Sequence, residues 1–302
     1  MATQEIRAST ARAENPPPDY SQYRTLALSL LLVIVLALVW EGAKAFGAAN
    51  NYAVNVGETT VDLNILTDTQ LPHLTDIFRA FGEPAQRNGA PLYQMLIESG
   101  WFTFWAALRG FLIGGVFGFA LAVIFAHSGL LQRGLLPYVV ASQTVPMIAI
   151  APMIVIWMGR AGATDLAVPV IAAYLTFFPV TIYTLRGLTS VPETALELMQ
   201  TYAASRREIL FKLRLPNALP QIFTALKISA TASVVGAIIG ELPSGFQNGL
   251  GIAILNFARY YNQSPPRLWA TIFAAGLLGI LFFTAVALVE RVVVRWRVVE
   301  SE

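Results

Sequence analysis

Long apolar runs constrain what this chain can fold into more than any other feature. A helix needs about 20 apolar residues to cross the hydrocarbon core of a bilayer. Hydrocarbon offers no partner for backbone amides, so a run that crosses it folds as a helix rather than as an isolated strand. Six such runs are present, at 25–46, 102–126, 135–158, 166–185, 221–240 and 268–289. We therefore predict an all-α membrane protein with six transmembrane helices.

The composition supports this class and excludes several others. Mean hydropathy is +0.59, with 56% hydrophobic and 13% charged residues, which is more apolar material than a soluble core needs. A net charge of +2 does not suggest a nucleic-acid partner. With no cysteine, the chain has no disulfide, thiolate metal site or thiol nucleophile. His73 and His127 lie far apart, no acidic and histidine residues have metal-ligand spacing, and no nucleophile–base set is evident, so we predict no enzyme activity.

Few ionisable residues fall in or near the apolar runs, and these are Arg109, Lys227 and Glu241. Proton-coupled transporters carry chains of acidic and histidine side chains through the membrane, and no such chain is visible here. We expect Lys227 to extend its ammonium group toward the nearer membrane surface. The sequence also lacks the Gly-x4-Gly-Lys-Ser/Thr loop that cradles nucleotide phosphates. Any ATP-driven transport would therefore depend on another subunit.

The runs divide the chain into five parts. We predict a disordered tail over 1–24, a first transmembrane helix over 25–46, an extracytoplasmic loop over 47–101, a five-helix core over 102–290 and a second tail over 291–302. The first run could be mistaken for a signal peptide, since Ala43-Lys44-Ala45 resembles a cleavage site. Cleavage would leave an odd number of spans, so we interpret this run as a retained helix.

Lysine and arginine placement predicts the orientation, because cytoplasmic segments carry an excess of both. With the N-terminus inside, the inner segments hold twelve of them and the outer segments six. Both termini are therefore expected in the cytoplasm, together with the charged loop at 190–216.

Small residues recur every four positions in the second and fifth runs, and such ridges let helix backbones approach closely. They are Gly110, Gly114, Gly118, Ala122 and Ala126 in the second run, and Ala225, Ser229, Ser233 and Ala237 in the fifth. We interpret both ridges mainly as helix-packing surfaces, although a pore wall needs small residues too.

The loop at 190–216 contains signals for a pair of short helices. Pro192 and Glu193 suit the first turn of a helix that would end near Tyr202. Ser205 and Glu208 have the spacing of a capping box, which predicts a second helix up to Leu213. Pro216 and Pro220 should then prevent an uninterrupted helix into the fifth run. An ordinary amphipathic loop on the membrane surface is the alternative reading of this segment.

The spacing of this loop resembles the "EAA" loop by which permease subunits of ATP-binding-cassette (ABC) importers contact their ATPase. That pattern is Glu-Ala-Ala, three residues, Gly, nine residues and Ile-x-Leu-Pro. The corresponding residues, which the resemblance assigns to ATPase coupling together with Ser205 and Arg206, are Glu197, Leu198, Met199, Ala203, Leu213, Leu215 and Pro216.

Further blocks between about 103 and 296 are similar to the nitrate, sulfonate and taurine branch of these permeases. They are Gln143-Thr144-Val145-Pro146 with Ala151-Pro152 and Trp157-Met158-Gly159, Phe177-Phe178-Pro179 with Gly187-Leu188, and Glu241 with Gly249-Leu250-Gly251. The resemblance implies a MetI-like core with cytoplasmic coupling helices in the bacterial inner membrane. It also implies two copies of an ABC ATPase, a second permease that is the same chain or a homologue, and a periplasmic or lipid-anchored solute-binding protein. No cofactor is expected on this chain, with ATP and Mg²⁺ on the ATPase.

Three features depart from the family pattern. Ala203 stands where the pattern has glycine, so a turn requiring positive φ would be strained here. Leu198 and Met199 replace the two alanines. The loop at 47–101 is unusually long, with strand-like alternation at 54–56 and 60–63; it could contact the solute-binding protein or be an inert excursion.

The translocation path is assigned from position alone. A proline break at Pro146 should free backbone carbonyls beside polar side chains, so we predict that the path is lined by Gln143, Thr144, Pro146 and Met147, with Glu241 near the outer mouth. The expected solute is small and polar, such as a sulfonate, nitrate, or a pyrimidine or riboflavin-type precursor. The competing hypothesis is a stand-alone secondary transporter or channel.

Overall fold

The computed structural model describes residues 21–294 except 57–58 and 87–88. The chain divides into two compact units, residues 1–74 and 75–302, which are described separately below. Most of the two predicted tails lies outside the described residues. Helix α1 (Ser21–Ala49) already includes the last four residues of the tail expected over 1–24, and the last helix includes the first three residues of the tail expected over 291–302.

The first unit combines one long helix with a small hairpin. Helix α1 is followed by strands β1 (Ala53–Val56) and β2 (Thr59–Asp62) and a 3₁₀ turn, η1 (Asn64–Leu66). The two strands pair antiparallel with Val54 opposite Val61. The alternation in the sequence therefore indicated the two strands correctly, whereas their pairing as a hairpin was not predicted.

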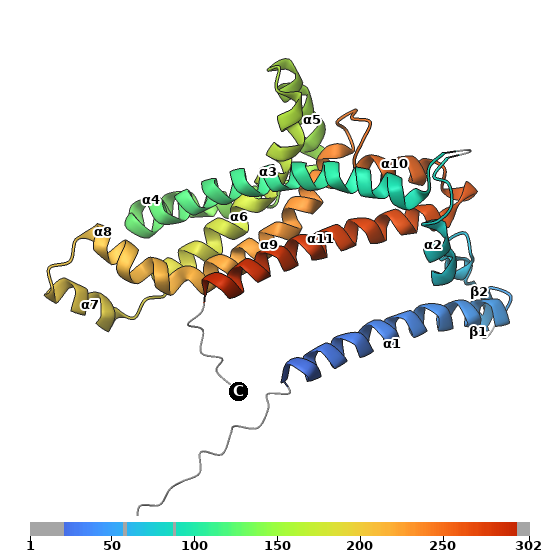
Figure 1. The fold of residues 1–302 in the computed structure, drawn as a ribbon, viewed down its shortest axis with the longest axis horizontal. Helices are drawn as coiled ribbons and strands as arrows, with labels where there is room; N and C mark the ends of the chain where they lie inside the picture. Colours follow the sequence, from blue (N-terminus) through green and yellow to red (C-terminus); the bar gives the residue numbers. More distant parts are fainter. Residues whose placement is uncertain (1–20, 57–58, 87–88, 295–302) are drawn as a thin grey trace, which may run out of the picture. The chain divides into compact units, whose positions relative to one another are not determined.

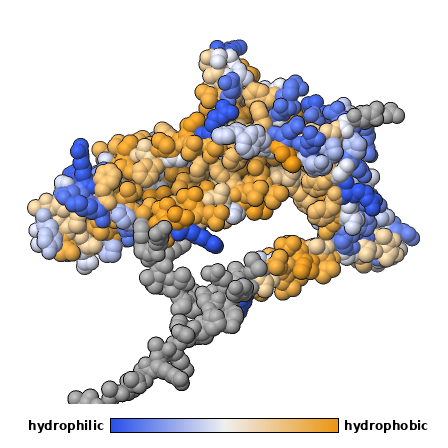
Figure 2. All heavy atoms as spheres, viewed as in Figure 1, coloured by the Kyte–Doolittle hydropathy of each residue, from blue (hydrophilic) through white to orange (hydrophobic). Residues whose placement is uncertain are grey.

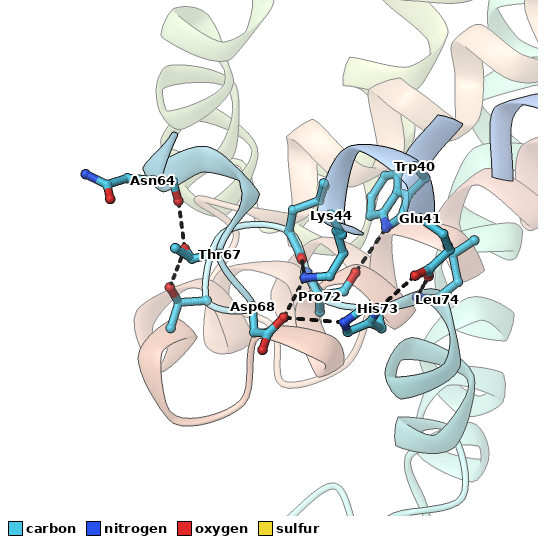
Figure 3. A network of polar contacts seen from close by, with 11 residues as sticks. Trp40, Glu41, Lys44, Asn64, Thr67, Asp68, Pro72, His73 and Leu74 are labelled. Atoms are coloured by element: carbon cyan, nitrogen blue, oxygen red, sulfur yellow. Dashed lines mark hydrogen bonds and ion pairs between the residues drawn. The ribbon is translucent and has the colours of Figure 1, made fainter. Parts of the chain in front are cut away.

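Polar contacts fasten the loop at 67–74 to the end of α1, as Figure 3 shows. Lys44 is only 2% exposed. Its Nζ atom donates to Asp68 Oδ1 and to the carbonyl of Leu71, both at 2.5 Å. Glu41 accepts from the backbone amide of Leu74 at 2.8 Å and lies 2.7 Å from His73 Nδ1. The hydrogen bond from Lys44 lowers the pKa of the Asp68 carboxyl below its usual value. Lys44 is therefore an internal clamp of this unit.

The second unit is a helical bundle (Figure 1). Its longer helices are α3 (Leu92–His127), α4 (Gly129–Ser142), α5 (Met147–Arg160), α6 (Ala167–Thr189), α9 (Leu215–Glu241), α10 (Leu250–Arg259) and α11 (Pro265–Val293). The short elements are α2 (Leu74–Ala80), η2 (Thr164–Leu166), α7 (Glu193–Thr201), α8 (Arg206–Glu208), η3 (Ile209–Arg214) and η4 (Tyr261–Gln263). Helices α7 and α8 lie at one end of the bundle and α10 at the other.

The described residues contain five helices long and apolar enough to cross a membrane, or six spans if one bent pair is counted. This confirms the six runs as helical. The third run, in which a break at Pro146 was predicted, consists of α4 and α5, which meet at an angle of 97° across a four-residue break that ends at Pro146. The second run also starts ten residues earlier than predicted, at Leu92, because Leu92, Leu96, Ser99 and Thr103 continue its buried face.

Helix α6 is packed between α3 and α9 at backbone contact distance. A Cβ atom added at Gly114 of α3 would lie 2.4 Å from the carbonyl oxygen of Ala173. On α9, a Cβ atom at Gly236 would lie 2.7 Å from the Cα atom of Ala172. Lipid chains are as apolar as leucine, so helix association in a membrane depends on such close van der Waals packing. The small-residue ridge of α3 and that of α9 are therefore packing surfaces within one chain.

Helix α11 is attached to the bundle by aromatic contacts and one ion pair. The ring of Phe282 packs edge-on against Phe104 and Phe111 of α3, with centroids 5.5 and 5.2 Å apart. Lys227 of α9 lies 2.6 Å from Glu290 of α11, with side-chain exposures of 19% and 11%. This corrects the sequence interpretation of Lys227: its charge is matched by a carboxylate on a neighbouring helix that sequence spacing could not pair with it.

Apolar side chains cover the outside of the second unit between two more polar ends, as Figure 2 shows. Large exposed apolar residues on this surface include Val116 on α3 and Ile280 on α11. A soluble monomer seldom exposes apolar patches of this extent. The pattern is that of a surface in contact with lipid or with another apolar helix.

Replacement of Gly114 by alanine tests the α3–α6 contact. We expect Gly114→Ala to destabilise the fold by about 1–3 kcal/mol, because the new methyl group overlaps the backbone of α6. Gly115→Ala is the matched control, since nothing lies within 4 Å of a Cβ atom there. Thermal unfolding followed by gel filtration in detergent measures both; equal unfolding temperatures would contradict the close approach.

Removal of one partner from the Lys227–Glu290 pair tests its role. Glu290→Gln should destabilise the protein by about 3 kcal/mol, because it leaves a partly buried ammonium group without its counter-charge. The double replacement Lys227→Met with Glu290→Met should cost less than the single change, since neither charge remains. If the loss of stability in the double variant equals the sum of the losses in Lys227→Met and Glu290→Met, the two residues are not coupled.

Candidate functional site

The segment from Glu193 to Arg214 forms two short helical pieces joined by a tight turn. Helix α7 spans Glu193–Thr201, close to the predicted first helix. At the second, Ser205 Oγ accepts from the amide of Glu208 at 3.3 Å, and Glu208 Oε2 accepts from the amide of Ser205 at 2.9 Å. The predicted capping box is therefore confirmed, and it fixes where the chain re-enters a helix.

The turn between the two pieces depends on Ala203. Its φ angle is +52°, in the left-handed region where glycine is favoured. The amide of Ala203 donates to the carbonyl of Gln200 and that of Ala204 to Met199, at 2.8 and 3.0 Å. These bonds close the end of α7 and hold the alanine in an unfavourable conformation. The turn therefore does adopt the positive φ for which the glycine of the family pattern is suited, and alanine at this position adds local strain.

The second piece does not stop before the fifth span, contrary to the sequence prediction. Helix α8 passes through the π-helical segment η3 directly into α9, so that residues 206–241 form one continuous helical rod. Within it, the amide of Leu215 donates to the carbonyl of Leu210, five residues back. The wider π turn lies immediately before Pro216, whose missing amide and ring would disturb an ordinary α turn. The proline therefore coincides with a local change of helix type instead of a break.

The predicted coupling residues separate into an exposed and an anchored group. The exposed group consists of Glu197, Leu198, Ala203, Ser205 and Arg206. The anchored group, at least partly buried, consists of Met199, Leu213, Leu215 and Pro216. Leu215 packs against a core cluster of Leu188, Ala218 and Ile222. The first half of the motif thus presents a surface, and the second half fixes that surface to the bundle.

Two further contacts hold the segment in place. Arg214 Nη1 donates to the carbonyl of Ala126 at the end of α3, at 3.0 Å. Lys212 pairs with Glu208 one turn earlier, with 2.9 Å between Nζ and Oε1. The first contact joins η3 to the end of α3, and the second stabilises the passage from α8 into η3.

Sequence reasoning missed an aromatic residue on this surface. The side chain of Tyr202, at the end of α7, is 78% exposed, and Leu198 one turn earlier is 57% exposed. Aromatic residues are enriched where one protein contacts another, so Tyr202 is a candidate contact residue. An aromatic residue inside an otherwise polar, charged loop was the available signal.

The predicted path residues fall at the α4–α5 break. Gln143 caps α4, Thr144 is exposed, and Pro146 precedes the first turn of α5. The hydroxyl of Tyr174 on α6 donates to the carbonyl of Ser142 and so fastens the break to the core. The Nε2 atom of Gln143 is buried and has no hydrogen-bond partner among the described residues. The unpartnered amide of Gln143 agrees with the expectation that this break frees polar groups. That these residues line the translocation path stays a prediction.

Met147 and Glu241 are placed differently from the expectation. Met147 is 6% exposed and packs with Ala151 and Ile171. Glu241 is fully buried, and its Oε2 atom accepts from the amide of Gly251 at 2.7 Å. Gly249, with φ at +133°, is required there because a Cβ atom would lie 2.5 Å from this carboxylate. In this conformation Glu241 holds the start of α10 and does not face a mouth.

Replacement of Ala203 by glycine tests the strained turn. We expect Ala203→Gly to stabilise the turn by about 1 kcal/mol, because glycine adopts positive φ without the steric cost that alanine bears. Hydrogen exchange of the Ala204 amide should slow by roughly fivefold, the factor that corresponds to this energy. Ala195→Gly within α7 should act in the opposite direction, since its helical φ favours alanine. Faster exchange in Ala203→Gly would show that the turn is not strained.

Comparison with known proteins identifies the family. Residues 114–295 match the sequence model of the binding-protein-dependent transport system inner membrane component. The formylaminopyrimidine transport permease protein ThiX of Halalkalibacterium halodurans is 36% identical over 62% of this chain and 73% of its own length. The riboflavin transport system permease protein RibX of Chloroflexus aurantiacus is 32% identical over 63% and 69%.

Solved structures agree on the fold. The MetNI methionine ABC transporter matches with a TM-score of 0.53 at 19% identity, over 67% of this chain and 97% of the matched chain. An amino acid ABC transporter matches with the same score at 16% identity, over 66% and 94%. The matched residues run from Gly114, within α3, through the end of α11. The chain therefore belongs to the binding-protein-dependent inner membrane components, the permease subunits of ABC importers.

Proposed function

We propose that the surface formed by α7 and the start of α8 binds a cytoplasmic ABC ATPase and passes its motion to α9. The observation that carries the proposal is the continuous helix from Arg206 to Glu241, which joins an exposed end of the bundle to its most buried layer. A displacement of that end cannot be absorbed by a flexible linker. Leu198 and Tyr202 supply apolar contact area, and Glu197 and Arg206 supply charges around it.

The assembly proposed around this chain is the one that family membership implies in outline. An ATPase and a solute-binding protein belong to such a system. We infer two copies of the ATPase and a second permease, either this chain again or a homologue, because family membership implies such a pair and the centre of the bundle is occupied by α6 packed tightly against α3 and α9. The broad apolar outer surface is consistent with lipid around such a pair.

Orientation follows from the same surface. With both termini in the cytoplasm, α7 and α8 lie on the side where ATP is available. The charge asymmetry of the sequence supports this side, since Arg206, Arg207, Lys212 and Arg214 all belong to this segment. The opposite end, with α10, would then meet the solute-binding protein, and the loop at 47–101 would lie on that side.

For the path, we propose the α4–α5 break as its lining element, through Gln143, Thr144 and Pro146. Broken helices at membrane depth are found where backbone lines a cavity or is covered by protein. Nucleotide binding would draw the two coupling surfaces together and open the path to the outside, and hydrolysis would reverse this. None of residues 141–147, which form the break and its flanks, carries a charge. This favours a solute that is recognised mainly by the binding protein.

The solute is expected to be small and polar. Relatives carry names that refer to formylaminopyrimidine, riboflavin, aliphatic sulfonates and nitrate. The two of these relatives that are more than 30% identical to this chain are named for formylaminopyrimidine and riboflavin, which are both heteroaromatic solutes. We propose this class first and an organic or inorganic anion second. Cells that lack their own importers and express the complete complex would distinguish the two classes, when uptake of a compound from each class is measured.

A charge reversal on the exposed surface tests the coupling proposal. Glu197→Lys should reduce ATP-driven uptake at least tenfold while the protein still inserts and folds, because the reversed charge would repel the docking groove of the ATPase. Glu83→Lys, an equal charge change on an exposed carboxylate outside the segment, is the control.

The measurement is solute uptake and ATP hydrolysis in vesicles that contain the complete complex. The ATPase should co-purify with the wild-type chain and with Glu83→Lys, and less with Glu197→Lys. Normal solute-stimulated ATP hydrolysis in Glu197→Lys would overturn the coupling role. Uptake that continues without ATP and stops when the proton gradient is removed would favour the secondary-transporter hypothesis instead.

A further inference from the structure

A pocket of about 450 Å³ lies at the end of the bundle opposite α7. It is built by segments that are far apart in the sequence: the loop before α3, the first turn of α3, the end of α10, η4 and the start of α11. Small-molecule sites usually have volumes between about 300 and 1,000 Å³. The pocket is therefore large enough for a small ligand, and it uses none of the coupling or path residues discussed above.

The lining of the pocket is rich in hydrogen-bond donors. Arg267 supplies a guanidinium group, and Gln86, Asn256 and Gln263 supply side-chain amides, with the hydroxyl of Ser264 beside them. No aspartate or glutamate is among the described residues that line it. A guanidinium group has five N–H donors and no acceptor. A donor-rich pocket that contains one fixed positive charge is chemically suited to an anion.

Arg267 itself lies in an unusual position. Its Nε atom is buried and has no hydrogen-bond partner among the described residues, and no ion pair to its side chain is found in the described part of the chain. Buried polar groups are nearly always hydrogen-bonded, so an exception requires an explanation. Its backbone is ordinary: the amide donates to the carbonyl of Ser264 at 3.2 Å, and the carbonyl accepts from Thr271 at 2.8 Å.

The local helix makes this charge more costly. Arg267 is in the first turn of α11, at the positive end of the helix dipole, where a cation is unfavourable and an anion is stabilised. The two residues before it, Pro265 and Pro266, have no amide hydrogen, so the backbone supplies few donors of its own at this end. Recognition of an anion here would therefore depend on the guanidinium group of Arg267.

We propose that this pocket binds an oxyanion group, namely a carboxylate, sulfonate or phosphate, through Arg267 with support from the surrounding amides. Planar guanidinium groups recognise such groups through paired N–H···O bonds, which lysine cannot reproduce. The oxyanion has two sources of the same chemistry: a free anion from solution or the head group of an anionic phospholipid. The proposal concerns binding alone and does not depend on the ATPase coupling or on the direction of transport.

The test uses the full chain in nanodiscs of phosphatidylcholine, with radiolabelled inorganic phosphate as the probe and methanesulfonate as a competitor. Wild-type protein should bind one phosphate saturably, and methanesulfonate should displace it. Arg267→Gln should raise the half-saturation concentration at least tenfold, and Arg267→Lys should fall between the two. Arg259→Gln, which removes an exposed arginine at the end of α10 outside the pocket lining, should bind like the wild type.

Phosphatidylglycerol added to the nanodiscs distinguishes the two sources. If it displaces phosphate from the wild-type protein, the occupant is a lipid head group; if it does not, the occupant is a free anion. Asn256→Leu is the second variant, since it blocks one wall without changing the charge, and it should weaken binding several-fold even if Arg267→Gln fails to fold. Binding that is absent from the wild type, or equal in the wild type, Arg267→Gln and Asn256→Leu, would overturn the proposal.

Discussion

Contact between helix backbones in the α3–α6–α9 layer is the constraint on which the rest of the second unit depends. Glycine at 110, 114 and 118 on α3 and at 236 on α9 brings both helices against α6 closely enough that a single methyl group would overlap. In a bilayer the hydrophobic effect does not favour a neighbouring helix over a lipid chain. Complementary shape therefore has to select which helices pack together. With these three helices fixed, α11 can be added through aromatic rings and one ion pair. The break between α4 and α5 can then be fastened by Tyr174 from the rigid centre.

The sequence was sufficient for the features that are local or periodic. The apolar runs predicted the helices, the four-residue ridge of α3 predicted a packing face, and Ser205 with Glu208 predicted where a helix restarts. The two strands within 53–62 followed from simple alternation, although their pairing was not predicted. Each of these patterns lies within one continuous stretch of sequence and does not depend on which distant segment packs against it.

Features that depend on partners distant in the sequence could not be predicted. Lys227 was expected to reach toward the membrane surface, whereas Glu290, more than sixty residues away, neutralises it. Glu241 was placed near a mouth, but Gly249 and Gly251 fold back over its carboxylate. Pro216 was expected to end a helix, because the rule for an α-helix does not include a π turn. In all three cases the residue type was interpreted correctly as important, and the tertiary context decided what it does.

The π segment at Ile209–Arg214 has a consequence for how the two ends of the 206–241 rod are matched. An α-helix turns by about 100° for each residue, so one residue accommodated in a wider turn changes the angular relation between the faces on either side of it. The face that anchors the rod to α6 and the face that carries α7, the proposed ATPase contact, are thereby set independently. Loss of one residue within this segment would rotate α7 about the rod axis while the packing of α9 remained intact. The rotational setting of the proposed contact surface, as well as its composition, is thus encoded in the length of this short segment.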